Sequence, residues 1–307
     1  WHVRRDHEMV AGIFARDVLR LPIRLVFTSA AQHLHGVFPR WLISQMDAVI
    51  STTDLAASFV PNTTAVVPHG IDLDRFSKES DKLTAWKSSG LGGQFGIGVF
   101  GRVRPDKGTD VFVDAMLQVL PQLPEVTAVI AGLAQPQHQA FEKALRDKIA
   151  LAGMSDRIVF LGEVPAKDVH TWYQRCLLCV ACPRYEPFGL TPFEAAATGC
   201  ALVCSRTGAF EQLVQPGVNG ELVPTGDAKS LADAIARVMS DVNAAVAAAK
   251  AAARFFGPRR RRGRGDPADD LKLIAPHARQ QPRQFAFLAD DKHEIGRASC
   301  RERVYHP

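Results

Sequence analysis

Short runs of apolar residues alternate along this chain with stretches in which apolar residues recur every three or four positions. The runs predict nine strands: Arg24–Thr28, Ala48–Ile50, Thr64–Val67, Ile97–Phe100, Val126–Ala131, Ile158–Leu161, Leu178–Ala181, Ala201–Ser205 and Glu221–Val223. The stretches between them predict helices such as Asp110–Leu120, Gln137–Leu151, Lys167–Arg175 and Ser230–Met239. Continuous apolar strands separated by helices are typical of parallel sheets covered on both faces, so the pattern predicts a doubly wound α/β fold.

The pattern falls into two blocks, as expected for 307 residues at about 100–200 residues per domain. Residues 1–77 form the first block and residues 94–256 the second, and the polar, glycine-rich segment 78–93 is predicted to connect them. The chain begins at Trp1 rather than at a methionine, so we expect a fragment whose first domain is incomplete. No run approaches the roughly 20 apolar residues of a membrane helix, and the start lacks a secretory leader pattern.

The periodic pattern ends near Phe256, and the remaining residues are rich in Arg, Gly, Asp and Pro. This tail, residues 257–307, is either a native disordered basic segment or a sequence read in a shifted frame. Its ending, residues 294–304, resembles a peptide known from mis-translated sequences, which favours the second interpretation. The tail holds 12 basic and 7 acidic residues, whereas residues 1–256 hold 25 of each, so the whole net charge of +5 lies in the tail. Nucleic acid is therefore not an expected partner.

The densest chemical signal lies in residues 184–199, after the strand that ends at Ala181. A helix is expected to begin near Leu190, with Thr191 as its cap and Pro192 in its first turn. The free amides ahead of it would lie at the carboxyl edge of a parallel sheet, where anions bind. Glu186 and Glu194 flank these amides, and carboxylates accept hydrogen bonds from vicinal sugar hydroxyls. Taken alone, the two acids also have an ordinary explanation. Glu186 would be a solvated loop residue, and Glu194 would stabilise the helix dipole.

A second signal is the loop Gly101–Gly108, which follows the strand Ile97–Phe100. Arg102 and Lys107 in this loop could clamp a diphosphate, arginine through its planar fork and lysine as a point charge. An ordinary solvated turn explains the loop by itself. Its position at the same sheet edge as the glutamate segment favours the diphosphate interpretation.

Together the two segments resemble the nucleotide-sugar site of family 4 retaining glycosyltransferases, which have the GT-B fold of two Rossmann-like doubly wound domains. The resemblance spans residues 25–239. It rests on Glu-x7-Glu at Glu186 and Glu194, on Gly-Arg-x4-Lys-Gly at Gly101–Gly108, and on three further matches: Pro68–Asp72, Gly208-x2-Glu211 and Gly217-x2-Gly220. Residues 26–32 and 38–43 further resemble bacterial lipopolysaccharide-core mannosyltransferases, which implies GDP-mannose as the donor.

The resemblance also implies roles for the site residues. Arg102 and Lys107 would bind the donor diphosphate, Glu186 the transferred sugar and Glu194 the ribose hydroxyls. The backbone amides of Phe188, Gly189 and Leu190 would face the phosphate and sugar, and Gly101 is a further expected donor-binding residue. The family generally needs no metal, because the cations and a helix dipole offset the charge of the leaving diphosphate, so neither a metal nor another cofactor is expected.

The implied partners are a nucleotide-diphosphate sugar and a glycan or lipid-linked glycan acceptor. The implied location is the cytoplasm, with peripheral contact at the cytoplasmic face of the inner membrane as one option. The chain departs from the family where many members carry a histidine after the first predicted strand, because Ser29 or Ala30 stands there. Roles for His33, His35 and His69 therefore stay open.

Two other motifs are explained by packing. Gly96–Gly101 matches G-x-G-x-x-G by letter, but that motif needs its glycines in the turn after a strand, and here they fall inside one. Cys176, Cys179 and Cys182 have the spacing of an iron–sulfur motif. In a buried strand, however, Cys179 and Cys182 would point to opposite faces, so they are interpreted as core residues of a protein in a reducing cytoplasm.

The leading hypothesis is a transferase that moves a hexosyl group, with retention, from a nucleotide diphosphate to a lipopolysaccharide-core or related glycan. The alternative is a truncated nucleotide-binding remnant without catalytic activity. A dehydrogenase is the third hypothesis, and it lacks a properly placed glycine turn.

Overall fold

The computed structural model describes residues 1–31, 33–77 and 81–254. These residues fall into two compact units, one spanning Trp1–Gly70 and the other beginning at Ile71. The predicted tail, residues 257–307, lies outside the described residues. None of the helices in the described part of the chain is long and apolar enough to cross a membrane.

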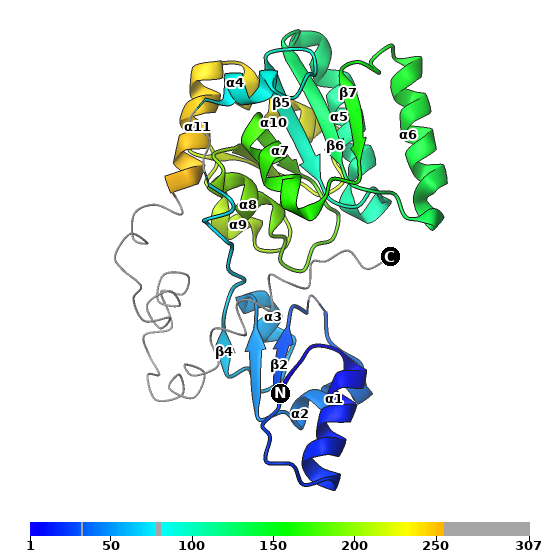
Figure 1. Cartoon of the computed structure of the whole chain (residues 1–307), viewed down its shortest axis with the longest axis vertical. Helices are drawn as coiled ribbons and strands as arrows, with labels where there is room; N and C mark the ends of the chain where they lie inside the picture. Colours follow the sequence, from blue (N-terminus) through cyan, green and yellow to red (C-terminus); the bar gives the residue numbers. More distant parts are fainter. Residues whose placement is uncertain (32, 78–80, 255–307) are drawn as a thin grey trace. The chain divides into compact units, whose positions relative to one another are not determined.

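The first unit is built on a four-stranded parallel sheet (Figure 1). Its strands lie in the order β1 (His2–Val3), β2 (Val26–Ser29), β3 (Ala48–Ser51) and β4 (Ala65–Val66). The connecting helices are α1 (Asp6–Ile13), which continues as a π-helical turn over Phe14–Val18, α2 (Val37–Ser44) and α3 (Asp54–Ser58). A small apolar core joins α1 and α2 to the sheet, with Met9, Phe27, Leu42, Ile43 and Val49 among its members. The three strands predicted here are confirmed to within two residues at each end.

The second unit contains a six-stranded parallel sheet in the order β10-β9-β8-β5-β6-β7. Its strands are β5 (Phe95–Phe100), β6 (Val126–Ala131), β7 (Ile158–Gly162), β8 (Cys176–Ala181), β9 (Ala201–Ser205) and β10 (Gly220–Val223). The chain runs outward from β5 to β7, and then returns to β8 on the other side of β5. The strand order therefore reverses between β5 and β8, which is where open α/β sheets bind their ligands.

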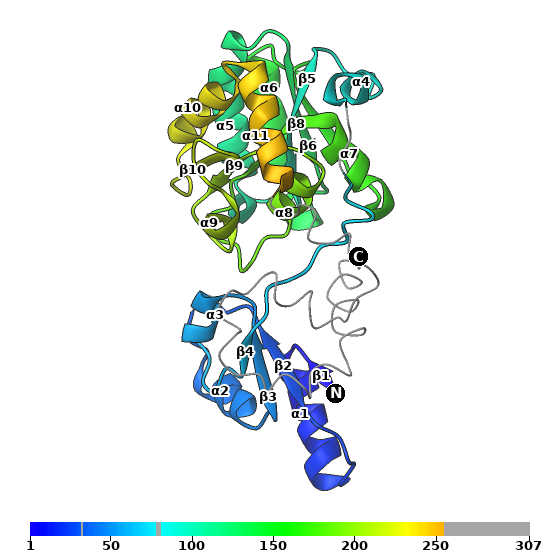
Figure 2. The same cartoon turned by 90° about the vertical axis from the view of Figure 1, so that its left-hand side faces the viewer.

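Helices cover both faces of this sheet (Figure 2). One face packs against α5 (Thr109–Val119), α6 (Gln139–Leu151) and α10 (Ala228–Met239). The other packs against α4 (Lys82–Lys87), α7 (Val169–Arg175), α8 (Thr191–Ala197) and α9 (Phe210–Leu213). The last described helix, α11 (Val242–Arg254), adds alanines to both cores. Because every residue of β6, β8 and β9 is buried, these strands read in the sequence as continuous apolar runs.

The segment predicted as the connection between the blocks, residues 78–93, is placed differently by the structure. Residues 82–87 form helix α4, whose N-terminal amides donate to the Asp81 side chain. Trp86 on this helix is fully buried in the core of the second unit, so the segment belongs to that unit. The burial of this one indole ring determines where the segment packs, although its neighbours are polar and rich in glycine. Burying a large aromatic side chain removes some 150–250 Å² of surface from water.

Neighbouring aromatic rings explain two glycines of the G-x-G-x-x-G match. Gly96 lies inside β5, and a Cβ on it would come within 2.2 Å of the Trp86 ring. A Cβ on Gly98 would come within 2.5 Å of the Phe100 ring. These two glycines therefore make room for aromatic rings beside a strand. They lie inside that strand, as predicted, and not in a phosphate-binding turn.

Candidate functional site

The two predicted site loops follow neighbouring strands at the reversal point of the sheet. The loop Gly101–Gly108, here called the cation loop, comes after β5. The loop 182–190, here called the glutamate loop, comes after β8, which pairs directly with β5. Both loops therefore leave the same carboxyl edge of the sheet, side by side.

Lys107 and Glu186 meet across these loops, although 79 residues separate them. The Lys107 Nζ atom donates to Glu186 Oε2 at 2.5 Å. Their side chains are 25% and 17% exposed, so the pair is partly shielded from water but still open to a ligand. Because an ammonium group has three donors, Lys107 can bind Glu186 and a phosphate oxygen at the same time.

Arg102, the other predicted cation, lies at the start of the cation loop and is exposed to solvent. Val103, which follows it, is fully buried and anchors this part of the loop in the core. The loop then turns through a short 3-10 helix, Pro105–Lys107, and ends at Gly108. The chain thus alternates an exposed cation, a buried anchor and a second cation in one short loop.

Gly189 shapes the glutamate loop between its two acids. Its φ angle is +80°, which favours glycine. A Cβ there would also approach the Phe210 ring to 2.3 Å and Glu186 Cγ to 2.7 Å. The backbone of this residue therefore packs directly against the Glu186 side chain, as a site built from this loop requires.

The start of α8 differs from the prediction by one residue. Leu190 occupies the cap position, Thr191 is the first helical residue, and no side chain caps the helix. The buried Leu190 already has helical φ and ψ angles of −77° and −21°, so the helix begins before the Thr191 hydroxyl can act as a cap. The expected cap at Thr191 is therefore wrong, whereas Pro192 lies in the first turn as predicted.

Glu194 is buried in the first turn of α8, with 8% exposure. Its Oε2 atom accepts a hydrogen bond from the Tyr173 hydroxyl at 3.1 Å. Tyr173 comes from α7 and is 1% exposed, and its ring centroid lies 4.2 Å from that of Phe100 at the end of β5. Sequence analysis did not identify Tyr173, because nothing in a helical stretch shows which distant acid its hydroxyl will reach.

The matched motif Gly208-x2-Glu211 also lies in the second unit. Gly208 contacts the glutamate loop, since a Cβ on it would come within 2.6 Å of the Phe188 carbonyl oxygen. Glu211 forms an exposed ion pair with Arg206 at 3.3 Å. His33, His35 and His69 all belong to the first unit, and the rings of the first two are 6.4 Å apart.

The cysteines are core residues. All five in the described part of the chain are buried and unpaired by disulfides. Cys176 and Cys179 lie in the core on one face of the sheet and Cys182 in the core on the other, which confirms the predicted opposition of Cys179 and Cys182. Burial raises the pKa of the Cys182 thiol to about 12. Within residues 1–31, 33–77 and 81–254, no cluster of three or more His, Cys, Asp or Glu could hold a metal ion.

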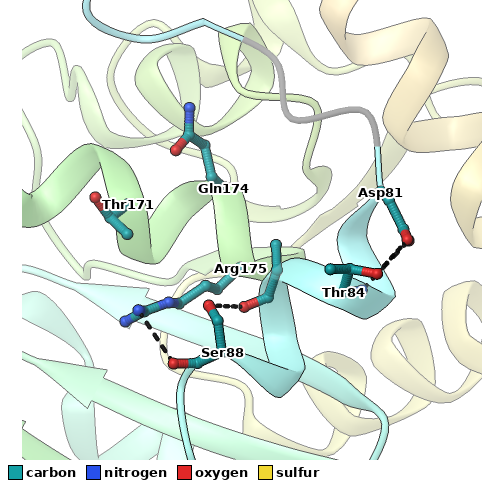
Figure 3. Close-up of a pocket in the computed structure, with 7 residues that line it drawn as sticks. Asp81, Thr84, Ser88, Thr171, Gln174 and Arg175 are labelled. Carbon is teal, nitrogen blue, oxygen red and sulfur yellow. Dashed lines mark hydrogen bonds between the residues drawn. The ribbon is translucent and has the colours of Figure 1, made fainter.

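A pocket elsewhere in the second unit contains none of the predicted site residues (Figure 3). It lies between α4 and α7 and is lined by Asp81, Thr84, Ala85, Ser88, Thr171, Gln174 and Arg175. Arg175 directly precedes β8, so the pocket is at the amino edge of the sheet, opposite the two loops. Its Arg175 guanidinium already donates to the Ser88 carbonyl at 3.4 Å. The site residues predicted from the sequence therefore lie at the carboxyl edge of the sheet, away from this pocket.

Comparison with known proteins matches the second unit to a family. Residues 85–255 match the family described as "Glycosyl transferases group 1". The chain is 46% identical over 247 residues to lipopolysaccharide core biosynthesis mannosyltransferase LpcC of Rhizobium leguminosarum bv. viciae, which covers 80% of this chain and 70% of that protein. It is also 46% identical over 246 residues to the mannosyltransferase LpsB of Rhizobium meliloti, covering 78% of this chain and 69% of that protein.

Solved structures give the same result. The C-terminal domain of LpcC, a glycosyl transferase group 1 protein of Francisella tularensis, aligns with a TM-score of 0.58 and 31% identity over 60% of this chain and 95% of that domain. Anabaena HepE, solved in complex with UDP and glucose, aligns with a TM-score of 0.70 and 25% identity over 82% of this chain and 72% of HepE. These neighbours are GT-B glycosyltransferases, and the predicted α/β class with parallel sheets is confirmed. Because the family match covers more than half of the chain and relatives share 46% identity with it, the chain belongs to the glycosyl transferases group 1 family.

Proposed function

We propose that this protein transfers a mannosyl group from GDP-mannose to a lipopolysaccharide-core glycan, with retention of the anomeric configuration. Two relatives that share 46% of their aligned residues with it are named as mannosyltransferases of lipopolysaccharide core biosynthesis, which supports the sugar and the acceptor. The observation that carries the proposal is the contact between Lys107 and Glu186 at the reversal point of the sheet.

In the proposed reaction, the bond between the anomeric carbon and the diphosphate oxygen breaks, and the acceptor hydroxyl oxygen bonds to that carbon. The hydroxyl proton ends on the departing diphosphate, the strongest base that the step generates. Arg102 and Lys107 stabilise the negative charge that develops on the diphosphate, and this electrostatic contribution is the main one the protein makes. Glu186, which lies beside Lys107, orients the sugar by accepting hydrogen bonds from its hydroxyl groups.

The two cations of the loop make a metal ion unnecessary in this scheme, and the two acids accept hydrogen bonds from hydroxyl groups of the donor. Glu194 accepts hydrogen bonds from the ribose hydroxyls. The backbone amides of the glutamate loop at Phe188, Gly189 and Leu190 face the phosphate and sugar. A lipopolysaccharide-core acceptor supports a cytoplasmic location, with the lipid-linked acceptor at the inner membrane as part of the proposal.

Titration calorimetry of the full chain with GDP and UDP tests the donor, paired with a transfer assay using GDP-mannose and a lipopolysaccharide-core acceptor. We expect GDP to bind about tenfold or more tightly than UDP, EDTA to leave binding unchanged, and the product to keep the anomeric configuration by NMR. A preference for UDP would overturn GDP-mannose as donor. Binding without transfer would support the remnant hypothesis, and binding of neither nucleotide would contradict both.

The hydrogen bond between Tyr173 and Glu194 gives a second prediction. We expect Tyr173→Phe, which removes only the hydroxyl, to weaken GDP binding about three- to tenfold, because a hydrogen bond of about 1 kcal/mol no longer orients the Glu194 carboxylate. Calorimetry with GDP measures the effect. In a double-mutant cycle with Glu194→Gln, the two losses should not multiply, because both act through the same carboxylate. Full multiplication would show that Tyr173 acts elsewhere.

A further inference from the structure

Arg184 joins the two site loops more extensively than the site pair itself does. It lies in the glutamate loop, two residues before Glu186. Its backbone N–H donates to the Asp106 carbonyl at 2.8 Å, and its Nη1 atom donates to the Pro105 carbonyl at 2.5 Å. Its two terminal nitrogens each donate to one oxygen of Asp110 at 2.8 Å, so the guanidinium binds that carboxylate in a bidentate way. All three partners belong to the cation loop or the first turn of α5.

The charges of this pair agree with its geometry. Burial alone would raise the pKa of the Asp110 carboxyl, but the hydrogen bonds and charge of Arg184 outweigh it and lower that pKa. The stability linked to this shift is therefore present above the ordinary carboxyl pKa of about 3.9 and is lost as the pH falls through the lowered value. Since the two side chains are 39% and 31% exposed, solvent screens their attraction, and the pair contributes little to overall stability. Its value lies in geometry, because a planar fork fixes the direction as well as the distance of its partner.

The proposed reaction requires the two loops to keep their relative position while the donor is bound. In the proposed reaction, Lys107 and Glu186 also bind the diphosphate and the sugar, so their mutual contact is not the only demand on these two side chains while the loops keep their relative position. Arg184 ties the glutamate loop to the cation loop through the Pro105 and Asp106 carbonyls, and to the first turn of α5 through Asp110, without using the Lys107 or Glu186 side chain.

We propose that Arg184 is a positioning residue, which clamps the glutamate loop to the cation loop and to Asp110 at the start of α5, and thereby holds Lys107 and Glu186 at the correct distance for the donor. This inference rests on the proposed function for its effect on turnover. A direct role, in which Arg184 is a third cation on the diphosphate, makes the opposite prediction for Asp110, because removing that acid would free the guanidinium to bind phosphate more tightly.

The test compares Arg184→Ala, Arg184→Lys, Asp110→Asn and the double variant Arg184→Ala with Asp110→Asn in the full chain. We expect each single variant to lower kcat about tenfold or more while the Kd for GDP changes less than about threefold, since misplacement of reacting groups by about 1 Å can cost up to about a hundredfold in rate. Arg184→Lys should recover little, because an ammonium cannot make the bidentate contact. The double variant should be no worse than either single one. Arg237→Ala, which removes an exposed arginine paired with Glu221 at 3.8 Å, is the control.

Hydrogen exchange gives a readout that does not depend on activity. In Arg184→Lys, backbone amides of residues 101–108 and 182–190 should exchange about tenfold faster, with α10 unchanged. If the wild-type chain transfers no sugar but these loops still loosen, the proposed function fails and the clamp stands. Unchanged exchange in these loops would overturn the clamp. The clamp would also be overturned if Arg184→Ala weakened GDP binding tenfold while Asp110→Asn strengthened it.

Discussion

Lys107→Ala in the full chain is expected to lower the turnover of sugar transfer about a hundredfold or more, the loss typical of a group that stabilises charge in the transition state. The Lys107 ammonium lies 2.5 Å from Glu186, at the point where the strand order reverses, and in the proposed reaction it stabilises the charge that develops on the leaving diphosphate. Initial rates of mannosyl transfer at saturating GDP-mannose measure the effect. The loss should fall mainly on kcat, because the charge on the diphosphate is greatest when the glycosidic bond is breaking.

Lys143→Ala is the matched control for this prediction. Lys143 also forms an ion pair at 2.5 Å, with Asp147, but its side chain is 75% exposed on α6, away from both loops. We expect this variant to transfer sugar at the wild-type rate, since exposed pairs contribute little. Near-normal transfer by Lys107→Ala would show that the diphosphate is bound elsewhere, and an equal loss in both variants would point to a general effect of surface charge.

Gly108→Ala is expected to reduce the free energy of unfolding by about 2–4 kcal/mol, the largest stability effect we predict. Gly108 has a φ angle of +70°, and a Cβ on it would come within 2.0 Å of the Cys182 backbone carbonyl oxygen. That oxygen belongs to the chain leaving β8, so it cannot move aside as the end of a flexible side chain would. The substitution should therefore separate the cation loop from the glutamate loop and lower transfer activity as well. Urea denaturation followed by far-UV circular dichroism measures the stability change.

Gly153→Ala separates the two causes of this effect. Gly153 has a similar φ angle of +66°, but no atom lies within 4 Å of the position of its Cβ. Its substitution should cost only about 1 kcal/mol, from the backbone conformation alone, and should leave transfer unchanged. If the two alanine variants were equally stable, the close approach between Gly108 and the Cys182 carbonyl would not contribute.

Most strands could be predicted from the sequence because burial on both faces leaves a continuous local signal. Val126–Ala131 and Ala201–Ser205 were predicted to the residue, and both are buried throughout. The loops after β5 and β8 were also recognisable, because their cations and acids cluster within a few positions. Lys107 and Glu186 were therefore both candidates, although the sequence could not show that they touch.

Local pattern was less informative where one distant contact decides the outcome. The helix over Lys82–Lys87 looks like part of a polar connection until Trp86 is seen in the core. The cap predicted at Thr191 was displaced because Leu190 is buried and already helical. In each case a single buried side chain, whose partners lie far away in the sequence, outweighs the propensities of its neighbours.

By itself, the sequence determined the class of fold, the strands of the second unit and the two loops that carry charged groups, because these depend on apolar runs and on residues close together in the chain. Only the tertiary structure decided which of these groups meet: Lys107 with Glu186, Tyr173 with Glu194, and Arg184 with Asp110. The physical reason is that each pair joins loops or helices 21–79 residues apart, and their meeting depends on the order of strands in the sheet, which no local pattern encodes.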